Sequence, residues 1–422
     1  MTKKRPESRT SSKASGSLAR RLPGSIWALG FVSMLMDVSS ELIHSLLPVF
    51  MVATLGASMM TVGIIEGAAE ATASIMKLFS GAVSDARQKR KGIAVLGYGL
   101  AALTKPMFPL ATSVAWVFVA RFTDRVGKGI RGAPRDALIA EIAPPHMRGA
   151  AYGLRQSLDS IGAFVGPAAA ILLMAFLADD VRSVLWVAVI PAVASVLVLQ
   201  FFVHEPESTA PAVTVRSMLV FRQAGGLMQR YWFVVFLGAL FTLARFSGAF
   251  LILRGQDVGL GARWAPLMLI VMNVVYAASA YPAGRLSDRL GPTTILIAGL
   301  GVLVGADILL AAASSPLVAT LGAAVWGLHM GMTQGLTARL VADTAPKHLR
   351  GTAFGIFHLV GGIAVLAANL IAGAVWKTHG AAATFALGAG FATLAAAGIF
   401  LRRKSIRAAP ESALQGSAAE ER

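Results

Sequence analysis

Cysteine is absent from the 422 residues of this chain, and charged residues make up only 14% of it. Without thiol groups the chain cannot form disulfide bonds, thiol-based catalytic sites or metal sites with thiolate ligands. The sequence also lacks the G-x-x-x-x-G-K-[ST] loop that cradles nucleotide phosphates, and no motif sets a nucleophile beside a base. We therefore expect neither an enzyme nor an ATP-driven pump, and we predict no cofactor, catalytic residue or metal site.

Hydrophobic residues, in contrast, make up 56% of the chain, and the mean hydropathy is +0.67. Apolar runs close to the length that a helix needs to cross roughly 30 Å of hydrocarbon recur from end to end. We count about twelve such runs by this criterion, six in each half. They cover residues 26–52, 61–83, 92–110, 114–142, 150–177 and 183–203, then 231–253, 264–282, 293–313, 316–342, 352–376 and 381–400. The predicted fold class is an all-α membrane protein.

Basic residues, which give the chain a formal charge of +17, gather in segments that an even number of spans leaves on one side. Because such segments favour the cytoplasm, we expect both termini there, in a bacterial inner membrane. This topology accounts for the charge without a nucleic-acid partner, and we expect a monomer in the lipid bilayer. The predicted organisation is a basic N-tail (1–25), a six-helix bundle (26–203), a cytoplasmic linker (204–230), a second six-helix bundle (231–401) and a C-tail (402–422).

Two short motifs occur once in each half. Gly81-Ala-Val-Ser-Asp85 returns 203 residues later as Gly284-Arg-Leu-Ser-Asp288, and Ala143-Pro-Pro-His-Met-Arg-Gly149 returns 202 residues later as Ala345-Pro-Lys-His-Leu-Arg-Gly351. Two unrelated motifs at nearly one spacing indicate that the chain is built from two similar halves. Paired halves in a membrane protein are typical of transporters that rock around a central site.

The first motif resembles the signature of the major facilitator superfamily, G-x-L-a-D-R-x-G-R-R, although Ala86 replaces its first arginine. The resemblance covers roughly residues 26–401 and implies two six-helix bundles that alternate access to one site at the membrane midplane. An aspartate at a helix end can accept hydrogen bonds from a facing helix N-terminus and from guanidinium groups. We therefore expect a cytoplasmic gate, which closes in the outward-open state, formed by Gly81, Asp85, Lys89, Arg90, Gly284, Asp288 and Arg289.

The fifth predicted span matches a glycine–proline pattern typical of proton-coupled exporters in this superfamily, through Gly153, Gly162, Gly166 and Pro167. At about 100° per residue, Gly162 and Gly166 share one helix face and Gly153 lies on the opposite one. We expect these two glycines to mark a close contact between the two bundles, with Pro167 bending the helix. Tight packing alone would explain the glycines almost as well.

Ionisable residues within the predicted spans are concentrated in the first half, where we count sixteen, eight of each sign. Such residues are costly at membrane depth and face a cavity or a partner. Asp37 and Glu41 share a face of the first span, and Arg121 and Arg125 share a face of the fourth. By resemblance, Arg121 holds the place of an arginine linked to proton coupling. We predict that these four residues couple transport to protons. The alternative is permanent ion pairs that hold the bundle together.

Substrate contacts are expected mainly in the second half, which offers polar and aromatic groups at cavity depth. The full predicted cavity set is His44, Glu66, Glu70, Arg245, Asn273, Tyr276, His329 and Gln334. The matched charges of the first half argue against an anionic substrate. The predicted function is efflux of a small organic molecule in exchange for protons by alternating access. The alternatives are uptake of an organic anion together with protons, and a membrane receptor that does not transport.

Overall fold

The computed structural model describes residues 22–87, 90–144, 147–205, 229–345 and 350–407, and these ranges contain helices and no β-strand. The first half comprises α2 (Gly24–Val49) with its π-helical extension η1 (Phe50–Thr54), α3 (Met59–Arg87), α4 (Arg90–Thr104), the 3-10 turn η2 (Lys105–Met107), α5 (Val114–Ile142), α6 (Arg148–Phe176), α7 (Val181–Val187) and α8 (Val189–Phe202). The second half comprises α9 (Gln229–Leu243), α10 (Gly248–Asp257), η6 (Ala262–Trp264), α11 (Leu267–Leu290), α12 (Pro292–Ala312), α13 (Pro316–Thr344) and α14 (Arg350–Arg407).

These helices form twelve spans. Seven stretches of the described chain are long and apolar enough to cross a membrane, and one of them, Ala353–Leu401, doubles back at Gly380 and supplies two spans. Gly380 has a backbone φ of 83°, which residues with a Cβ atom rarely adopt. The shorter α4 and the more polar α3, α5 and α13 complete the set. The predicted all-α fold of two six-helix bundles is confirmed.

The repeat extends to the way that helices begin. Ser113 caps α5 by accepting a hydrogen bond from the Trp116 N–H (3.3 Å), and Ser315 caps α13 by accepting one from the Val318 N–H (3.5 Å). These serines are 202 residues apart, which is the spacing of the second repeated motif. The fourth span of each half therefore starts with the same N-cap chemistry.

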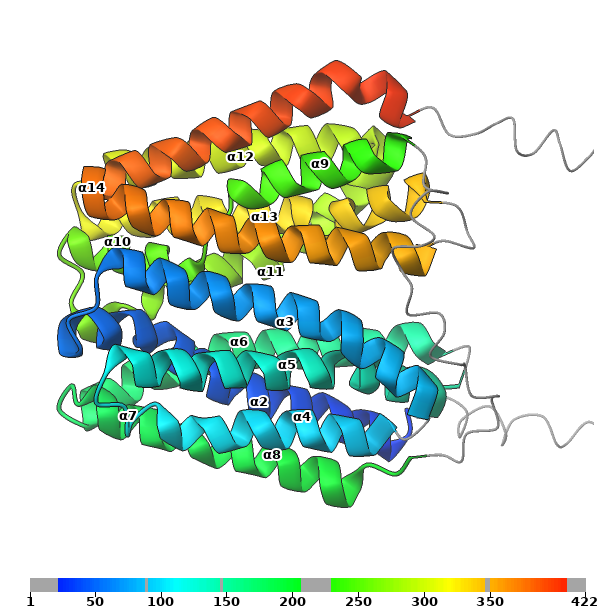
Figure 1. The fold of residues 1–422 in the computed structure, drawn as a ribbon, viewed down its shortest axis with the longest axis vertical. Helices are drawn as coiled ribbons and strands as arrows, with labels where there is room; N and C mark the ends of the chain where they lie inside the picture. The colour runs from blue at the N-terminus through cyan, green and yellow to red at the C-terminus, as the bar shows by residue number, and fades with distance from the viewer. Residues whose placement is uncertain (1–21, 88–89, 145–146, 206–228, 346–349, 408–422) are drawn as a thin grey trace, which may run out of the picture.

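The two halves lie side by side, with the start of α2 and the end of α14, the termini of the described chain, at the same end of the molecule (Figure 1). Within the first half, α2 packs on α6 and α8, while α5 packs on α3 and α4; within the second, α13 packs on α11 and α12, and α14 packs on α9 and α12. The halves meet where α3 packs on α14, α6 on α11 and η6, and α2 on α10. In Figure 1, α3 and α14 are closer together at the end opposite the termini and diverge toward the termini.

Candidate functional site

A cavity of about 1030 Å³ lies between the two halves. Its walls are α2, α3, α5 and α6 from the first half and α11, α13 and α14 from the second. The lining residues of α5 run from Lys128 to Arg135, near the end of that helix at Ile142, and those of α6 run from Gln156 to Phe164. The end of α5 at Ile142 and the start of α6 at Arg148 both lie on the side of the described termini, so the cavity faces that side.

The opposite side is closed by α3 and α14, whose backbones touch. A Cβ atom placed on Gly373 would lie 2.7 Å from the Met59 oxygen, and one on Gly67 would lie 3.1 Å from the Leu366 oxygen. A Cβ atom on Gly63 would collide with the Asn369 oxygen. Glycine is required because only its missing side chain lets two helices approach this closely. We call the contact formed by Met59, Gly63, Gly67, Leu366, Asn369 and Gly373 the seal.

An ion pair crosses between the halves on the same closed side. Arg263 of η6 donates from Nε and Nη2 to the two oxygens of Asp179, each at 2.8 Å. Asp179 follows the end of α6 and has a positive φ of 62°, as does its neighbour Ala178 at 53°. The hydrogen bonds from Arg263 lower the pKa of Asp179. Because both side chains are exposed, this ion pair stabilises the closed state only weakly.

Arg121 and Arg125 of α5 pair with acids of α3 rather than with Asp37 or Glu41 of α2. The Nη2 atom of Arg121 lies 3.0 Å from Glu66 Oε2 on α3, and Arg125 Nη2 lies 3.3 Å from Glu70 Oε1. The four residues predicted to couple transport to protons are therefore not one contact group. The physical reason is that acids one turn apart on α3 face arginines one turn apart on α5, and these two helices pack directly together.

The Arg121–Glu66 pair is buried, with side chains only 2% and 1% exposed. The same arginine nitrogen lies 3.0 Å from His44 Nδ1, and Glu66 Oε2 also accepts a hydrogen bond from Ser247 Oγ of the second half (3.1 Å). Neither His44, Glu66 nor Arg121 lines the cavity. His44 and Glu66, which were predicted to line the cavity, instead form a buried polar cluster with Arg121, and this cluster joins the halves through Ser247.

The α2 acids do face the cavity. Asp37 is 30% exposed at its side chain, and its nearest ion-pair partner is Arg131, at 4.0 Å. Glu41 lines the cavity and forms no ion pair within 4.0 Å among the described residues. Of the other predicted cavity residues, four line it: Glu70, Asn273, Tyr276 and Gln334.

Two predicted substrate residues lie elsewhere. His329 is fully buried inside the second half, with Nδ1 2.7 Å from the Gly299 oxygen, so its prediction as a cavity residue is wrong. Arg245 lies in the break between α9 and α10 and does not line the cavity; its guanidinium stands over the Phe241 ring, 5.3 Å from the centroid. Both sit at cavity depth along the chain, but sequence position alone does not show which way a side chain points.

The cavity has basic residues that the predicted site did not include. Lys77 of α3 and Lys128 of α5 line it, and neither forms an ion pair within 4.0 Å in the described part of the chain. The Lys77 side chain passes over Gly132, one turn after Lys128, so the two lysines belong to one wall. Periodicity gave a signal for both, because each lies on the charged face of its helix. The walls also include Arg131, Arg135, Asp159 and His358.

The glycines of α6 pack within the first half. A Cβ atom on Gly162 would lie 2.8 Å from the Met34 oxygen and 2.9 Å from Asp37 Cβ, and one on Gly166 would lie 2.8 Å from the Val38 oxygen and 2.9 Å from Glu41 Cβ. The prediction that they mark a contact between the bundles is wrong, because helical periodicity identifies a face without identifying the helix opposite it. Gly153 has open space beside it, and Pro167 lies inside the uninterrupted α6.

The predicted cytoplasmic gate falls largely outside the described side chains, which exclude those of residues 81–89 and Asp288. Arg90 is described, and its guanidinium pairs with Glu141 of α5 at 2.7 Å. Its backbone N–H donates to Glu205 Oε1 (2.5 Å), so the end of the first half caps α4. Gly284 has open space around it, and Arg289 is exposed. The gate stays a prediction.

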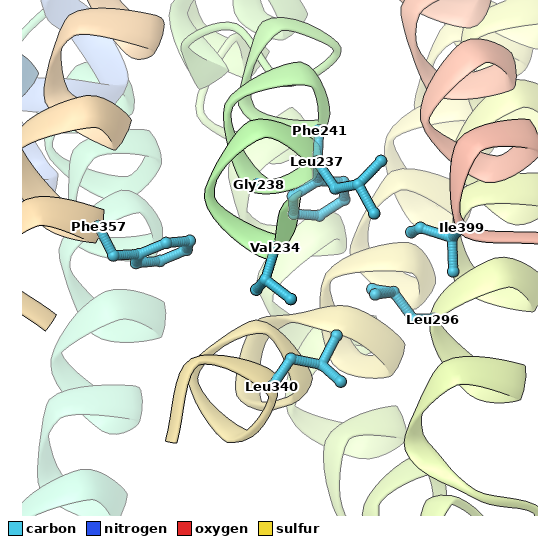
Figure 2. Close-up of a pocket in the computed structure, with 8 residues that line it drawn as sticks. All are labelled: Val234, Leu237, Gly238, Phe241, Leu296, Leu340, Phe357 and Ile399. Carbon is cyan, nitrogen blue, oxygen red and sulfur yellow. The ribbon is translucent and has the colours of Figure 1, made fainter. Parts of the chain in front are cut away.

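A second, much smaller pocket lies inside the second half (Figure 2). Its volume of about 20 Å³ has room for a water-sized molecule and no more. Every labelled residue in Figure 2 is apolar, so the pocket offers no group to orient a polar substrate. The lining comes from four helices: Val234, Leu237, Gly238 and Phe241 of α9, Leu296 of α12, Leu340 of α13, and Phe357 and Ile399 of α14.

Comparison with known proteins agrees with this architecture. The family model described as Major Facilitator Superfamily matches residues 29–363 and, in a second match, 234–420. An uncharacterized MFS-type transporter of Methanocaldococcus jannaschii is 31% identical over 368 residues, covering 85% of this chain and 90% of the relative. A probable 4-methylmuconolactone transporter of Cupriavidus pinatubonensis is 27% identical, covering 84% and 82%.

The crystal structure of the nucleoside transporter NupG has the same fold, with a TM-score of 0.73 at 13% identity, covering 90% of this chain and all of the other. Family model and relatives together span both halves of the chain. The chain belongs to the major facilitator superfamily and is a multi-pass membrane transporter of small molecules, not an enzyme.

Proposed function

We propose that this transporter moves a small organic molecule through the cavity by alternating access, coupled to protons, and that the described conformation is open to the cytoplasm. The observation that carries the proposal is a cavity with carboxyl groups in its wall, open on one side and closed by the seal on the other. The orientation follows from the basic tails and loops, which favour the cytoplasmic side.

The carboxyl groups suited to proton coupling are those of Asp37 and Glu41. Both face the cavity. Among the described residues Glu41 has no ion-pair partner within 4.0 Å, and Asp37 has only Arg131, at 4.0 Å, so each can exchange a proton with the water there. Glu66 and Glu70, in contrast, are held by arginines. Gly162 and Gly166 bring the α2 backbone against α6 beneath these two acids, so a shift of α6 relative to α2 would change their surroundings directly.

Export of the substrate in exchange for protons, which the glycine–proline pattern of α6 favours, is the first candidate for the direction of coupling. A second candidate is uptake of an organic anion together with protons. It is supported by Lys77 and Lys128, which face the cavity without an ion pair and could bind a carboxylate. A relative named as a probable 4-methylmuconolactone transporter fits such a substrate.

The charge of the substrate determines whether it is expected to move with protons or against them. Protonating Glu41 removes a negative charge from a wall that holds the two lysines, so a proton and an organic anion would favour each other's binding. A cationic substrate would instead compete with the proton. Anions are then expected to move with protons, and cations against them.

The test uses purified protein in liposomes under an imposed pH gradient, with 4-methylmuconolactone and a lipophilic cation as probes. Cation movement against the proton flow supports exchange, and lactone movement with it supports co-transport. In either case Glu41→Gln is expected to uncouple movement from the gradient. Gradient-driven transport that persists in Glu41→Gln and in Asp37→Asn would overturn the assignment of the coupling groups.

The lysines are tested in the same assay. Lys77→Gln and Lys128→Gln should weaken lactone movement while leaving cation movement intact, because only the anion uses their charge. The matched control is Lys377→Gln, an exposed lysine of α14 outside the cavity. Equal loss for both probes would show that the lysines support the fold rather than bind an anion.

A further inference from the structure

Asp307 lies inside the second half with a carboxyl group that has no partner. It sits on α12, which carries no other charged residue, and the residue is 0% exposed. Neither of its carboxyl oxygens has a hydrogen-bond partner in the described structure. An ionised carboxylate in such a place is very unfavourable, whereas the neutral acid is far less so. The site therefore suits a carboxyl group that carries its proton.

Space for this group is made by a glycine on another helix. A Cβ atom on Gly388 of α14 would lie 2.9 Å from Asp307 Oδ2 and 3.2 Å from Phe246 Cε1. Carboxyl group, phenyl ring and glycine backbone thus meet at one point. The Phe246 ring packs in turn on Trp326 and Phe385, with ring centroids 5.5 and 5.3 Å away, so an aromatic wall keeps water from the acid.

No charged group near α12 neutralises Asp307. Arg254 of α10 donates to the Leu310 and Ala313 oxygens at the end of α12 and pairs with Asp257, and His329 of α13 is bonded to Gly299. Neither forms an ion pair or hydrogen bond with the Asp307 carboxyl group, and the same is true of the described titratable groups of α11 and α14. Those groups are Tyr276, Tyr281, Arg285, Arg289, His358, Lys377 and His379.

The aromatic neighbour links Asp307 to the closed side of the cavity. Phe246 lies in the break between α9 and α10, and the next residue, Ser247, contacts both halves. Its Oγ donates to Glu66 Oε2 (3.1 Å), and its backbone N–H donates to Asn369 Oδ1 (2.8 Å). Asn369 belongs to the seal. Opening the seal must break the bond between Ser247 and Glu66, which is the one of the two that crosses between the halves, and the adjoining Phe246 ring would then shift away from Asp307.

We infer that Asp307 is a further proton-binding site, loaded in the described conformation and discharged when the seal opens. On opening, water reaches the carboxyl group, its O–H bond breaks, and the proton passes to that water. On closing, the carboxylate takes a proton back from the same side, so the site follows the state of the seal without carrying protons outward. The inference rests on the proposed alternating access, but it adds a titratable site in the second half, outside the cavity wall.

Infrared spectroscopy tests the loaded state on purified full-length protein in detergent, without substrate. At neutral pH the wild type should show the carbonyl stretch of a protonated carboxylic acid that disappears in Asp307→Asn. The same band should remain in the matched variant Glu141→Gln, because the Glu141 carboxylate of the wild type pairs with Arg90 and does not carry the band. Asp307→Leu provides a second variant if the asparagine protein is poorly folded. A spectrum unchanged by both substitutions would overturn the inference.

The discharge step is tested with Gly373→Leu, which cannot form the seal, and with Gly361→Leu, which has open space on the same helix. The Asp307 band should weaken in the first variant and persist in the second. Spin labels across the seal report independently whether it has opened. A full band with an open seal would refute the discharge of Asp307, whereas a seal that never opens would refute alternating access itself.

Discussion

Replacing Gly373 by alanine should shift the molecule away from the described conformation. The added Cβ atom would lie 2.7 Å from the Met59 oxygen and 3.0 Å from Met60 Cα, both backbone atoms that cannot rotate aside. Since non-bonded atoms pack at about 3.5 Å, α3 and α14 must part by roughly 1 Å. Overpacking of this kind costs about 1–3 kcal/mol.

This cost falls on the closed seal alone, because an open seal no longer contains the contact. The ratio of open to closed molecules should therefore rise by roughly 5- to 150-fold, at about 1.4 kcal/mol for each factor of ten. Gly361→Ala is the matched control. It makes the same substitution on the same helix, where no atom lies within 4 Å of the added group.

The measurement is electron–electron distance spectroscopy, for which a chain without cysteine accepts labels only where they are introduced. Labels at Ser58 and Thr378 flank the seal, and labels at Arg148 and Arg285 span the cavity mouth. Gly373→Ala should lengthen the first distance and shorten the second, with Gly361→Ala matching the wild type. Identical distributions in all three proteins would refute the role of the seal in holding this conformation.

Two further predictions concern charged pairs. Arg121→Met should lower the free energy of unfolding by about 3–5 kcal/mol, because it leaves a buried carboxylate unpaired. The double variant with Glu66→Gln should recover most of this loss in denaturation experiments. If the single and double variants are equally unstable, lost packing rather than unpaired charge is responsible. The Asp179–Arg263 pair is present at neutral pH and should be lost as the pH falls through and below 3.8, the ordinary value, since its hydrogen bonds lower the pKa of Asp179. The seal labels should then respond less to acid in Asp179→Asn than in the wild type, and an equal response would exclude this pair as the cause.

The fold could be predicted because its signals are local. Apolar runs of the right length fix the spans, and repeated motifs about 200 residues apart fix the two halves. The break in the seventh span was missed, although Ser247 followed by Gly248 is a helix start signal within an otherwise continuous apolar run. The sequence therefore contained the serine caps and glycine turns that predict such breaks, but a count based on hydropathy alone does not detect them.

The site was harder to predict, because pairing depends on how helices are rotated against each other. Periodicity correctly gathered the charges onto faces, yet it could not show that α3, rather than α2, supplies the partners of Arg121 and Arg125. That choice is made by close packing far along the chain, as where a Cβ atom on Gly97 of α4 would lie 2.7 Å from the Arg131 nitrogen of α5. Such contacts leave only a glycine in the sequence, with no mark of its partner.

The seal joins bare backbone to bare backbone, and this bears on how fast the two halves can separate. Interlocked long side chains must change rotamer before their helices part, which adds an activation barrier to each movement. At Gly63 and Gly373 the facing atoms are backbone, so no side chain needs to change rotamer there, and separation loses mainly dispersion contacts together with the hydrogen bond from Ser247 to Glu66. We therefore expect the rate of opening to depend on what the cavity holds, with the glycine surfaces themselves adding little friction.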